Sequence, residues 1–306
     1  MDEFGLIRRY FTRDADSPGI VVGVGDDGAL LRPAADLDQV QVIDTLVEGV
    51  HFPSDMQPAD VGYRLVAVNL SDIASMGAVP RWMTLALTLG KKDEHWVAEF
   101  ADGLFAAADE YNVALVGGDT TSGDAVVATV HMTGEVARGK ALLRSGARPG
   151  DTIFVTGSTG DAAAGLALLQ EGRHDNYLVG RFLRPSARID KGRELAGLAS
   201  AAIDVSDGLV GDLAKLLDAS GAGGELDIGR LPLADELIGY CGKPQAILFA
   251  LTGGDDYELC FTAPADAVTG ISGITSIGKV TNGRGVVCRH EGKIVDVDSS
   301  GYRHVL

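Results

Sequence analysis

Apolar and polar residues follow two different periods along the first half of the chain. A period of two, or a short unbroken apolar run, predicts β-strands at 41–49, 82–89, 113–120 and 126–136. Apolar residues three and four positions apart predict amphipathic helices at 58–77 and 93–112. Asp60 is expected to cap the first of these helices, because its side chain can accept a hydrogen bond from a free amide. This alternation is typical of proteins that mix helices and strands.

A segment rich in glycine and proline, residues 144–160, ends this region and predicts turns. Beyond its turns, the pattern predicts a strand at 152–157, helices at 161–172 and 187–199, a strand leading into a helix at 201–220, and a turn between two β-like runs at 246–263. We therefore expect an α/β fold of mixed α+β type with two domains, residues 1–143 and 144–306.

Composition narrows the class of protein. The chain has 306 residues, and 43 Asp and Glu against 26 Lys and Arg give a formal net charge of −17. Nucleic acids and anionic membrane surfaces are bound by clustered basic charge, so neither is expected as a partner. No apolar run reaches the ~18–20 residues of a membrane-spanning helix, and the N-terminus lacks the pattern of an export signal. The cysteines Cys241, Cys260 and Cys288 are widely spaced, so we expect reduced, mostly buried thiols in a cytoplasmic protein.

Aspartate residues repeatedly stand at or beside the ends of apolar segments, several of them next to glycine. They are Asp26, Asp27, Asp44, Asp72, Asp119, Asp204, Asp207, Asp255 and Asp256. Each alone could be a turn former or a helix cap, but turns do not need repeated acids next to glycines. Carboxylates at strand ends are hard oxygen ligands for Mg²⁺, and glycine lets the backbone approach a ligand closely. With Mg²⁺ between them, these acids could hold phosphates that they would otherwise repel, which favours phosphoryl-transfer or phosphate-hydrolysis chemistry.

Other short motifs are less specific. Gly23, Gly25 and Gly28 match the spacing of a dinucleotide-binding loop, but Pro33 follows where the helix of that fold should continue. The turn 157–160, between a strand and a helix, could bind an anion with its amides or could be an ordinary capped turn. The sequence contains neither a Walker loop nor the HRD and DFG motifs of protein kinases.

Several longer motifs occur together in one order along the chain. They are GDDGALL, DTLVEGVHF, AVNLSDIASMGAVP, LVGGDTTSG, AIDVSDGLVGDL and LTGGDDYEL. The set resembles the thiamine-monophosphate kinases, in the superfamily of aminoimidazole ribonucleotide synthetase, over essentially the whole chain. The resemblance implies phosphorylation of thiamine monophosphate by ATP to thiamine diphosphate, with several Mg²⁺ ions. It also implies an N-terminal domain whose sheet pairs with that of a second subunit in a homodimer, and a C-terminal α/β domain.

By position in these motifs, the resemblance assigns roles to particular residues. It implies Mg²⁺ ligands at Asp27, Asp44, Asp72 and Asp119 in the first domain, and at Asp204 and Asp207 in the second. It implies nucleotide contacts by Gly118, Asp119, Arg144 and Ser206, and contacts with the thiamine substrate by His51, Asp255 and Tyr302. The chain departs from the family pattern at Val42 and Ile43, where Ser or Thr often precedes the Asp of DTLVEG, and at Asp255, which replaces a Glu.

Other functions stay open at this point. A sister synthetase of the same superfamily would use ATP on a ribonucleotide or on selenide. A magnesium-dependent phosphohydrolase would use the same acids to release inorganic phosphate, and a nucleotide or metal sensor would bind without turnover. For the kinase no general base is expected, because a phosphate monoester has a second pKa of about 6 and is largely dianionic at pH 7.

Overall fold

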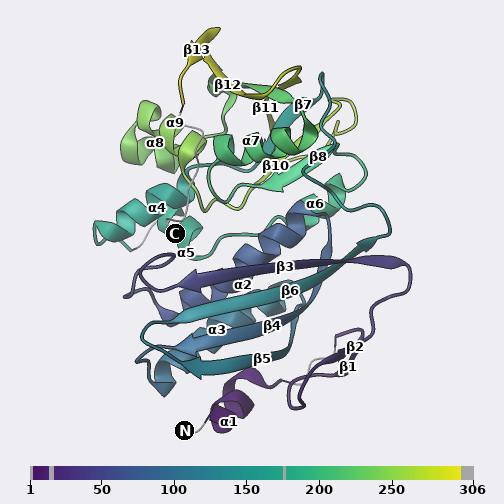
Figure 1. Cartoon of the computed structure of the whole chain (residues 1–306). Coiled ribbons are helices and arrows are strands. Elements are labelled where there is room, and N and C mark those ends of the chain that lie inside the picture. The colour runs from purple at the N-terminus through teal and green to yellow at the C-terminus, as the bar shows by residue number, and fades with distance from the viewer. Residues whose placement is uncertain (1–2, 14–16, 175–176, 298–306) are drawn as a thin grey trace. The chain divides into compact units, whose positions relative to one another are not determined.

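The computed structural model describes residues 3–13, 17–174 and 177–297 and divides the chain into two compact units. Unit 1 comprises Met1–Ile73 and Ala78–Gly139, and unit 2 comprises Ala74–Gly77 and Lys140–Leu306. Each unit combines helices with a β-sheet, as the sequence pattern predicts, and each is described by itself (Figure 1). The domain boundary expected after residue 143 stays a prediction.

Unit 1 is built on a four-stranded sheet of order β3-β6-β4-β5. Its elements are α1 (Glu3–Leu6), the π-helix η1 (Ile7–Phe11), β1 (Ile20–Val22), β2 (Leu30–Leu31), β3 (Leu37–Val47), α2 (Pro58–Ser75), β4 (Val79–Leu89), α3 (Glu94–Glu110), β5 (Ala114–Ser122) and β6 (Val127–Ala137). β4 and β5 are parallel, β6 is antiparallel to β3 and β4, and β1 and β2 form a separate antiparallel hairpin.

Helices α2 and α3 cover one face of this sheet (Figure 1). Their inward residues, such as Leu65 and Leu104, are fully buried, as is Met132 of the sheet. Burying a side chain of this size contributes about 1.5–3 kcal/mol. Gly62 of α2 lies at a close approach of the two helices, because a Cβ there would be 2.1 Å from the carbonyl oxygen of Phe100. Glycine therefore permits the close packing that fixes the helix layer against the sheet.

Helix α2 begins earlier than a cap at Asp60 requires. Its first helical residue is Pro58, a position that proline favours because its fixed φ suits the helix and it has no amide to leave unpaired. Asp60 therefore lies inside the first turn, and the expectation that it caps the helix is wrong. Its charge is still favourable there, near the positive end of the helix dipole. Helix α3 does have an aspartate cap, since Asp93 accepts from the amide of Trp96 at 2.9 Å.

Unit 2 is built on a seven-stranded sheet of order β13-β12-β9-β11-β7-β10-β8. Its strands are β7 (Thr152–Thr156), β8 (Ala201–Asp204), β9 (Gly223–Asp227), β10 (Leu259–Ala263), β11 (Ile274–Thr281), β12 (Gly285–His290) and β13 (Lys293–Val295). Its helices are α4 (Asp161–Gln170), α5 (Tyr177–Leu183), α6 (Ile189–Leu195), α7 (Leu209–Ser220), the 3₁₀ turn η2 (Ile228–Arg230), α8 (Asp235–Cys241) and α9 (Lys243–Thr252). Leu213 and Leu217 of α7 pack on Ile153 and Ile203 of the sheet in its largest core cluster.

Residues 246–252 are helical, although the sequence pattern predicts a β-like run there. They form most of α9, which begins after Gly242 with Pro244 in its first turn. Ala246 and Ala250, four residues apart, are both fully buried, which is the spacing of one helix face. A short, continuous apolar run does not distinguish a buried strand from a buried helix, and here helix-favouring Ala and Leu decide the outcome.

Three turns of unit 2 meet at one edge of its sheet. β10 lies between β7 and β8 and is antiparallel to both. The chain therefore leaves β7 and β8 at the same edge at which it enters β10. The turns there are 157–160 after β7, 205–208 after β8, and 253–258 before β10. Each of them carries one of the motifs that the sequence singled out.

Two general expectations can be compared with the described residues. No helix among residues 3–13, 17–174 and 177–297 is long and apolar enough to cross a membrane. All three cysteines are free thiols; Cys260 and Cys288 are buried and Cys241 is half-buried.

Candidate active site

Backbone hydrogen bonds join the turn after β8 to the turn before β10. The amide of Asp255 donates to the carbonyl oxygen of Ser206 at 2.9 Å, and that of Tyr257 donates to the carbonyl oxygen of Val205 at 2.9 Å. In return, the amide of Val205 donates to the carbonyl oxygen of Glu258 at 2.8 Å. These bonds hold the motifs AIDVSDG and GGDDYEL side by side. The residues expected to bind Mg²⁺ and nucleotide therefore lie beside the residue expected to bind the second substrate.

Gly254 lies where these two turns come closest. A Cβ at this residue would lie 2.5 Å from the carbonyl oxygen of Ser206, and a backbone oxygen cannot rotate away. We therefore expect Gly254→Ala to push the turns apart and to lower the free energy of unfolding by about 1–3 kcal/mol, measured by chemical denaturation. Gly239→Ala is the matched control, because a Cβ on that helical glycine meets no atom within 4 Å. Equal losses in the two variants would contradict the contact.

A lysine of α7, Lys215, lies against the turn after β8. Asp212 of α7 is buried and accepts from the amides of Ser206 and Asp207, both at 2.9 Å, so it supports the turn from inside. The Nζ atom of Lys215 lies 2.8 Å from Asp212 and 2.5 Å from Asp207. Burial raises the pKa of Asp212, and the ion pair with Lys215 offsets only part of that rise. Burial would lower the pKa of Lys215, but its bonds to the two carboxylates outweigh this effect and raise that pKa.

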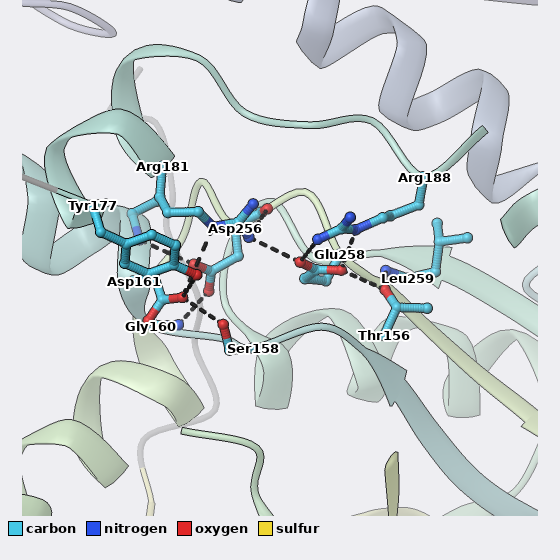
Figure 2. Close-up of polar contacts among 11 residues, drawn as sticks. Thr156, Ser158, Gly160, Asp161, Tyr177, Arg181, Arg188, Asp256, Glu258 and Leu259 are labelled. Carbon is cyan, nitrogen blue, oxygen red and sulfur yellow. Dashed lines mark hydrogen bonds and ion pairs between the residues drawn. The ribbon is translucent and has the colours of Figure 1, made fainter. Parts of the chain in front are cut away.

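The turn 157–160 is held by a carboxylate of the GGDDYEL motif (Figure 2). Asp256 is fully buried, and its oxygens accept from the amides of Gly160 at 2.5 Å and Ala162 at 3.1 Å, at the start of α4. A helix N-terminus favours negative charge, and here the anion at these amides is the chain's own side chain. The amides of Gly160 and Ala162 are therefore already occupied, which favours the interpretation as a capped turn. Burial raises the pKa of Asp256 well above its usual range, against the opposing effect of the two amide bonds.

Glu258 is the centre of a buried ion-pair network (Figure 2). Its side chain is fully buried and accepts from Arg188 Nε at 2.6 Å and Nη2 at 2.5 Å, and from Arg181 Nη2 at 2.9 Å. The hydroxyl of Thr156 donates to the same carboxylate at 2.5 Å. Arg181 also donates to the backbone carbonyl of Asp256 at 3.2 Å. The two arginines thus tie α5 and the segment before α6 to the turn that precedes β10.

A further buried carboxylate, Asp161, opens helix α4 (Figure 2). It accepts from the hydroxyls of Ser158 at 2.5 Å and Tyr177 at 3.0 Å, and Arg181 Nε lies 3.8 Å away. Burial raises its pKa, although the hydrogen bond from Ser158 and the charge of Arg181 act in the opposite direction. Its contacts add α5 to the elements that hold the turn 157–160.

In unit 1 the sheet separates two of the acids expected to bind metal. The register runs from Asp44 on β3 through Val130 and Leu85 to Gly118 on β5, so Asp44 points to the buried, helix-covered face. Asp119 is one residue further along β5 and therefore points to the other face, where it is exposed. The two strands are opposite edges of the sheet, about 14 Å apart at the usual strand spacing. Within this unit the two carboxylates are not brought together.

The other predicted residues of unit 1 lie on the hairpin, on α2 and on a turn. Asp27 is exposed in the loop between β1 and β2, where the glycines of the dinucleotide-like motif lead into a strand and not a helix. Asp72 is half-buried on α2, in the helix layer that Asp44 faces. His51 follows β3, and its Nδ1 accepts from the amide of Val47 at 3.0 Å, which places the proton of the neutral ring on Nε2. Glu48 holds the same turn through Lys92 at 2.9 Å.

The remaining predicted residues belong to unit 2. Asp204 ends β8 and is 5% exposed, and Ser206 is half-buried in the following turn. Arg144 is exposed, and its backbone carbonyl accepts from the hydroxyl of Ser220 at 3.0 Å. Tyr302 lies outside the described residues, so the structure does not place it.

Comparison with known proteins identifies the family. The model for the AIR synthase related protein, N-terminal domain, matches residues 25–136, and the model for its C-terminal domain matches residues 148–291. Thiamine-monophosphate kinase of Escherichia coli (strain K12) is 46% identical over 318 residues, covering 99% of this chain and 98% of that protein. The chain belongs to the thiamine-monophosphate kinase family.

Solved structures of this family have the same fold. Thiamine-monophosphate kinase from Stenotrophomonas maltophilia K279a superposes with a TM-score of 0.87 at 42% identity, covering 96% of this chain and 98% of that one. A structure described as "AaThiL complexed with AMPPCP and TMP" superposes with a TM-score of 0.82 at 34% identity, covering 99% and 97%. The mixed α/β, two-domain fold expected from the sequence is confirmed, and the chain is an enzyme of this kinase family.

Asp204, which ends β8, and Asp207 in the following turn have the ligand chemistry of a magnesium site that substrate would complete. Among the described residues, no group of three or more His, Cys, Asp or Glu side chains is arranged to hold a metal ion. Mg²⁺ is usually bound through one or two carboxylates together with substrate phosphates and water, so a complete protein cage is not required. Asp204 and Asp207 supply two such carboxylates from one short segment. Carboxylate oxygens are ligands that suit Mg²⁺, and in this structure the charge of Asp207 is paired with Lys215, which a bound ion would have to replace.

Sequence reasoning missed the residues that hold this kinase's turns. Arg181, Arg188 and Glu258 carry the network, yet none was a candidate from the sequence. Glu258 did offer a signal, because a charged residue that begins an apolar strand is almost never fully buried without a partner. The partners could not be identified, because Arg188 and Arg181 lie 70 and 77 positions away along the chain.

Proposed function

We propose that this enzyme transfers the γ-phosphoryl group of ATP directly to the phosphate of thiamine monophosphate. The observation that carries the proposal is the junction of the AIDVSDG and GGDDYEL turns at one sheet edge, in a chain that is 46% identical to a thiamine-monophosphate kinase. The described complex of AaThiL with AMPPCP, an ATP analogue, and TMP supports the same pair of substrates. The products are thiamine diphosphate and ADP.

Each predicted residue has a place in this proposal. Asp204 and Asp207 would hold Mg²⁺, and Ser206 between them would contact ATP together with the exposed Arg144. Asp255, hydrogen-bonded to Ser206 through its amide, would contact thiamine monophosphate in the neighbouring turn. His51 and Tyr302 are proposed as further contacts with that substrate.

The chemistry requires position and charge neutralisation more than proton transfer. A phosphate oxygen of thiamine monophosphate attacks the γ-phosphorus in line, while the bond from that phosphorus to the bridging oxygen of ADP breaks. The attacking phosphate has a second pKa of about 6 and needs no general base at pH 7. Bound Mg²⁺ would neutralise the charge that gathers on the phosphates. The task of the turns after β8 and before β10 is therefore to fix two polyanions at reacting distance.

In unit 1, the proposal concerns four aspartates and the sheet face opposite α2 and α3. Asp27, Asp44, Asp72 and Asp119 are proposed as further Mg²⁺ ligands, and Gly118 and Asp119 as nucleotide contacts. A homodimer formed through the sheet is supported by the face opposite α2 and α3, on which Ile43 is 64% exposed. A second subunit would also explain why Asp44 and Asp119 are not brought together within one chain. A cytoplasmic location is part of the same proposal and is supported by the three free cysteines.

A product assay tests the function against its alternatives. The protein is incubated with ATP and Mg²⁺ and with thiamine monophosphate, a ribonucleotide or selenide as the second substrate. Formation of thiamine diphosphate with thiamine monophosphate alone is the expected result. Turnover confined to a ribonucleotide or selenide would favour a sister synthetase, and release of phosphate without an acceptor would favour a phosphohydrolase. Nucleotide binding without any turnover would indicate a sensor.

A further inference from the structure

In the turn before β10, two residues other than glycine adopt a backbone conformation that favours glycine. Asp255 has a φ of 69° and Tyr257 a φ of 53°. Residues with a Cβ adopt this left-handed conformation only where the surrounding structure holds them in it, and such residues are concentrated at functional sites. Two of them within three positions indicate a turn whose shape matters.

The surroundings hold Asp255, Asp256 and Tyr257 of this turn by hydrogen bonds. The amides of Asp255 and Tyr257 donate to the carbonyls of the neighbouring turn, both at 2.9 Å. Between them, the carboxylate of Asp256 accepts from the start of α4, and its carbonyl accepts from Arg181 at 3.2 Å (Figure 2). The turn is therefore a rigid support for Asp255. This side chain is half-buried, whereas those of Asp256 and Tyr257 are buried.

The two adjacent aspartates have separate tasks. Asp256 is fully buried and is committed to the amides of Gly160 and Ala162. Asp255 is half-buried, and its Oδ1 accepts from the hydroxyl of Tyr257 at 3.1 Å. Tyr257 is itself 8% exposed, so its ring is packed and its hydroxyl has a fixed place. The phenol thus sets the direction in which the Asp255 carboxylate points.

We propose that Tyr257 is a positioning residue that orients Asp255 toward the thiamine half of thiamine monophosphate. The inference rests on the proposed function, in which Asp255 contacts that substrate. The thiazolium ring carries a positive charge, and the attraction of a carboxylate for it depends on distance and orientation. Tyr257 should therefore act on the binding of thiamine monophosphate through Asp255, and should have little influence on ATP.

A double-mutant cycle in steady-state kinetics tests this role. Tyr257→Phe keeps the packed ring and removes the hydroxyl, so we expect the KM for thiamine monophosphate to rise about 5–10-fold, the effect of losing one ordinary hydrogen bond. Both kcat and the KM for ATP should stay within about 2-fold of the wild type, since the change affects only one substrate. In an Asp255→Ala background, Tyr257→Phe should change the KM for thiamine monophosphate less than about 2-fold, because the two residues act as one unit.

Tyr240→Phe is the matched control. Tyr240 also donates its hydroxyl to a carboxylate, Glu171 at 3.0 Å, but on an exposed surface of the same unit. This variant should leave both KM values unchanged. A Tyr257→Phe effect of equal size in the Asp255→Ala background, or an effect on the KM for ATP, would overturn the inference and indicate a merely structural role.

The same measurements separate this inference from the proposed function. A wild-type enzyme that makes no thiamine diphosphate would overturn both. Thiamine diphosphate formation with an unchanged KM for thiamine monophosphate in Asp255→Ala would overturn the role of Tyr257 and leave the kinase activity standing.

Discussion

Asp207→Asn is expected to lower kcat by about 10²-fold or more, with the protein still folded, as for the loss of an electrostatic stabiliser of a transition state. The substitution keeps the size of the side chain and removes the charge that the proposed function assigns to Mg²⁺ binding beside the nucleotide. Asp44→Asn in unit 1 is expected to have an effect of the same order, because its carboxylate has the same proposed role. Initial rates of thiamine diphosphate formation at saturating Mg²⁺ measure both.

Asp218→Asn provides the control for the loss of charge at Asp207. Asp218 lies on α7, the helix that follows the same turn, and is exposed to solvent. Its substitution changes the net charge equally and should leave kcat within about 2-fold of the wild type, as surface substitutions away from a site usually do. Near-wild-type turnover of Asp207→Asn and Asp44→Asn would remove both residues from the catalytic machinery.

Glu258→Gln is expected to lower the free energy of unfolding by about 3–5 kcal/mol, since removing one partner leaves other charges buried without compensation. The network would lose the charge that Arg181 and Arg188 share, and their side chains are only 11% and 31% exposed. Denaturant unfolding of the full chain measures the loss, with amide hydrogen exchange in β7, β8 and β10 reporting on unit 2.

Glu225→Gln is the control for this prediction. Glu225 forms an ion pair with Arg289 at 2.7 Å, but both side chains are well exposed, at 43% and 37%. Exposed pairs contribute about 0–1 kcal/mol, so this variant should unfold almost as the wild type does. A similar, small loss for Glu258→Gln would show that the buried network does not hold the turns.

The fold was predictable where the sequence pattern is long and periodic. The helices at 58–77 and 93–112 and the four strands of the main sheet of unit 1 are found near the expected positions, because most of them present one apolar face over many residues. The short strands β1 and β2 were not predicted. The segment 246–252 was predicted wrongly because it is short and apolar throughout, so its period carries no information. The start of α2 was also predicted wrongly. Both Pro58 and Asp60 are typical of a helix start, and the helix begins at Pro58.

The site was predictable only as a set of motifs. AIDVSDG and GGDDYEL could be recognised as functional turns, but their junction through Ser206 and Asp255 depends on strand order in the sheet. The sequence pattern likewise did not distinguish the roles of Asp255 and Asp256. Only the fold shows that Asp256 is buried and accepts hydrogen bonds from the start of α4. The structure separates Asp44 and Asp119, although both belong to motifs expected to bind Mg²⁺. Successive side chains of a strand point to opposite faces of the sheet, and the register places these two carboxylates on different faces.

The fate of the γ-phosphate tests the central claim most directly. The enzyme is mixed with Mg²⁺, thiamine monophosphate and ATP labelled in the γ-phosphate, and the label is followed through a single turnover. Direct transfer predicts that the label appears in the terminal phosphate of thiamine diphosphate at the rate at which ADP forms. Label released as inorganic phosphate, with thiamine monophosphate unchanged, would contradict it.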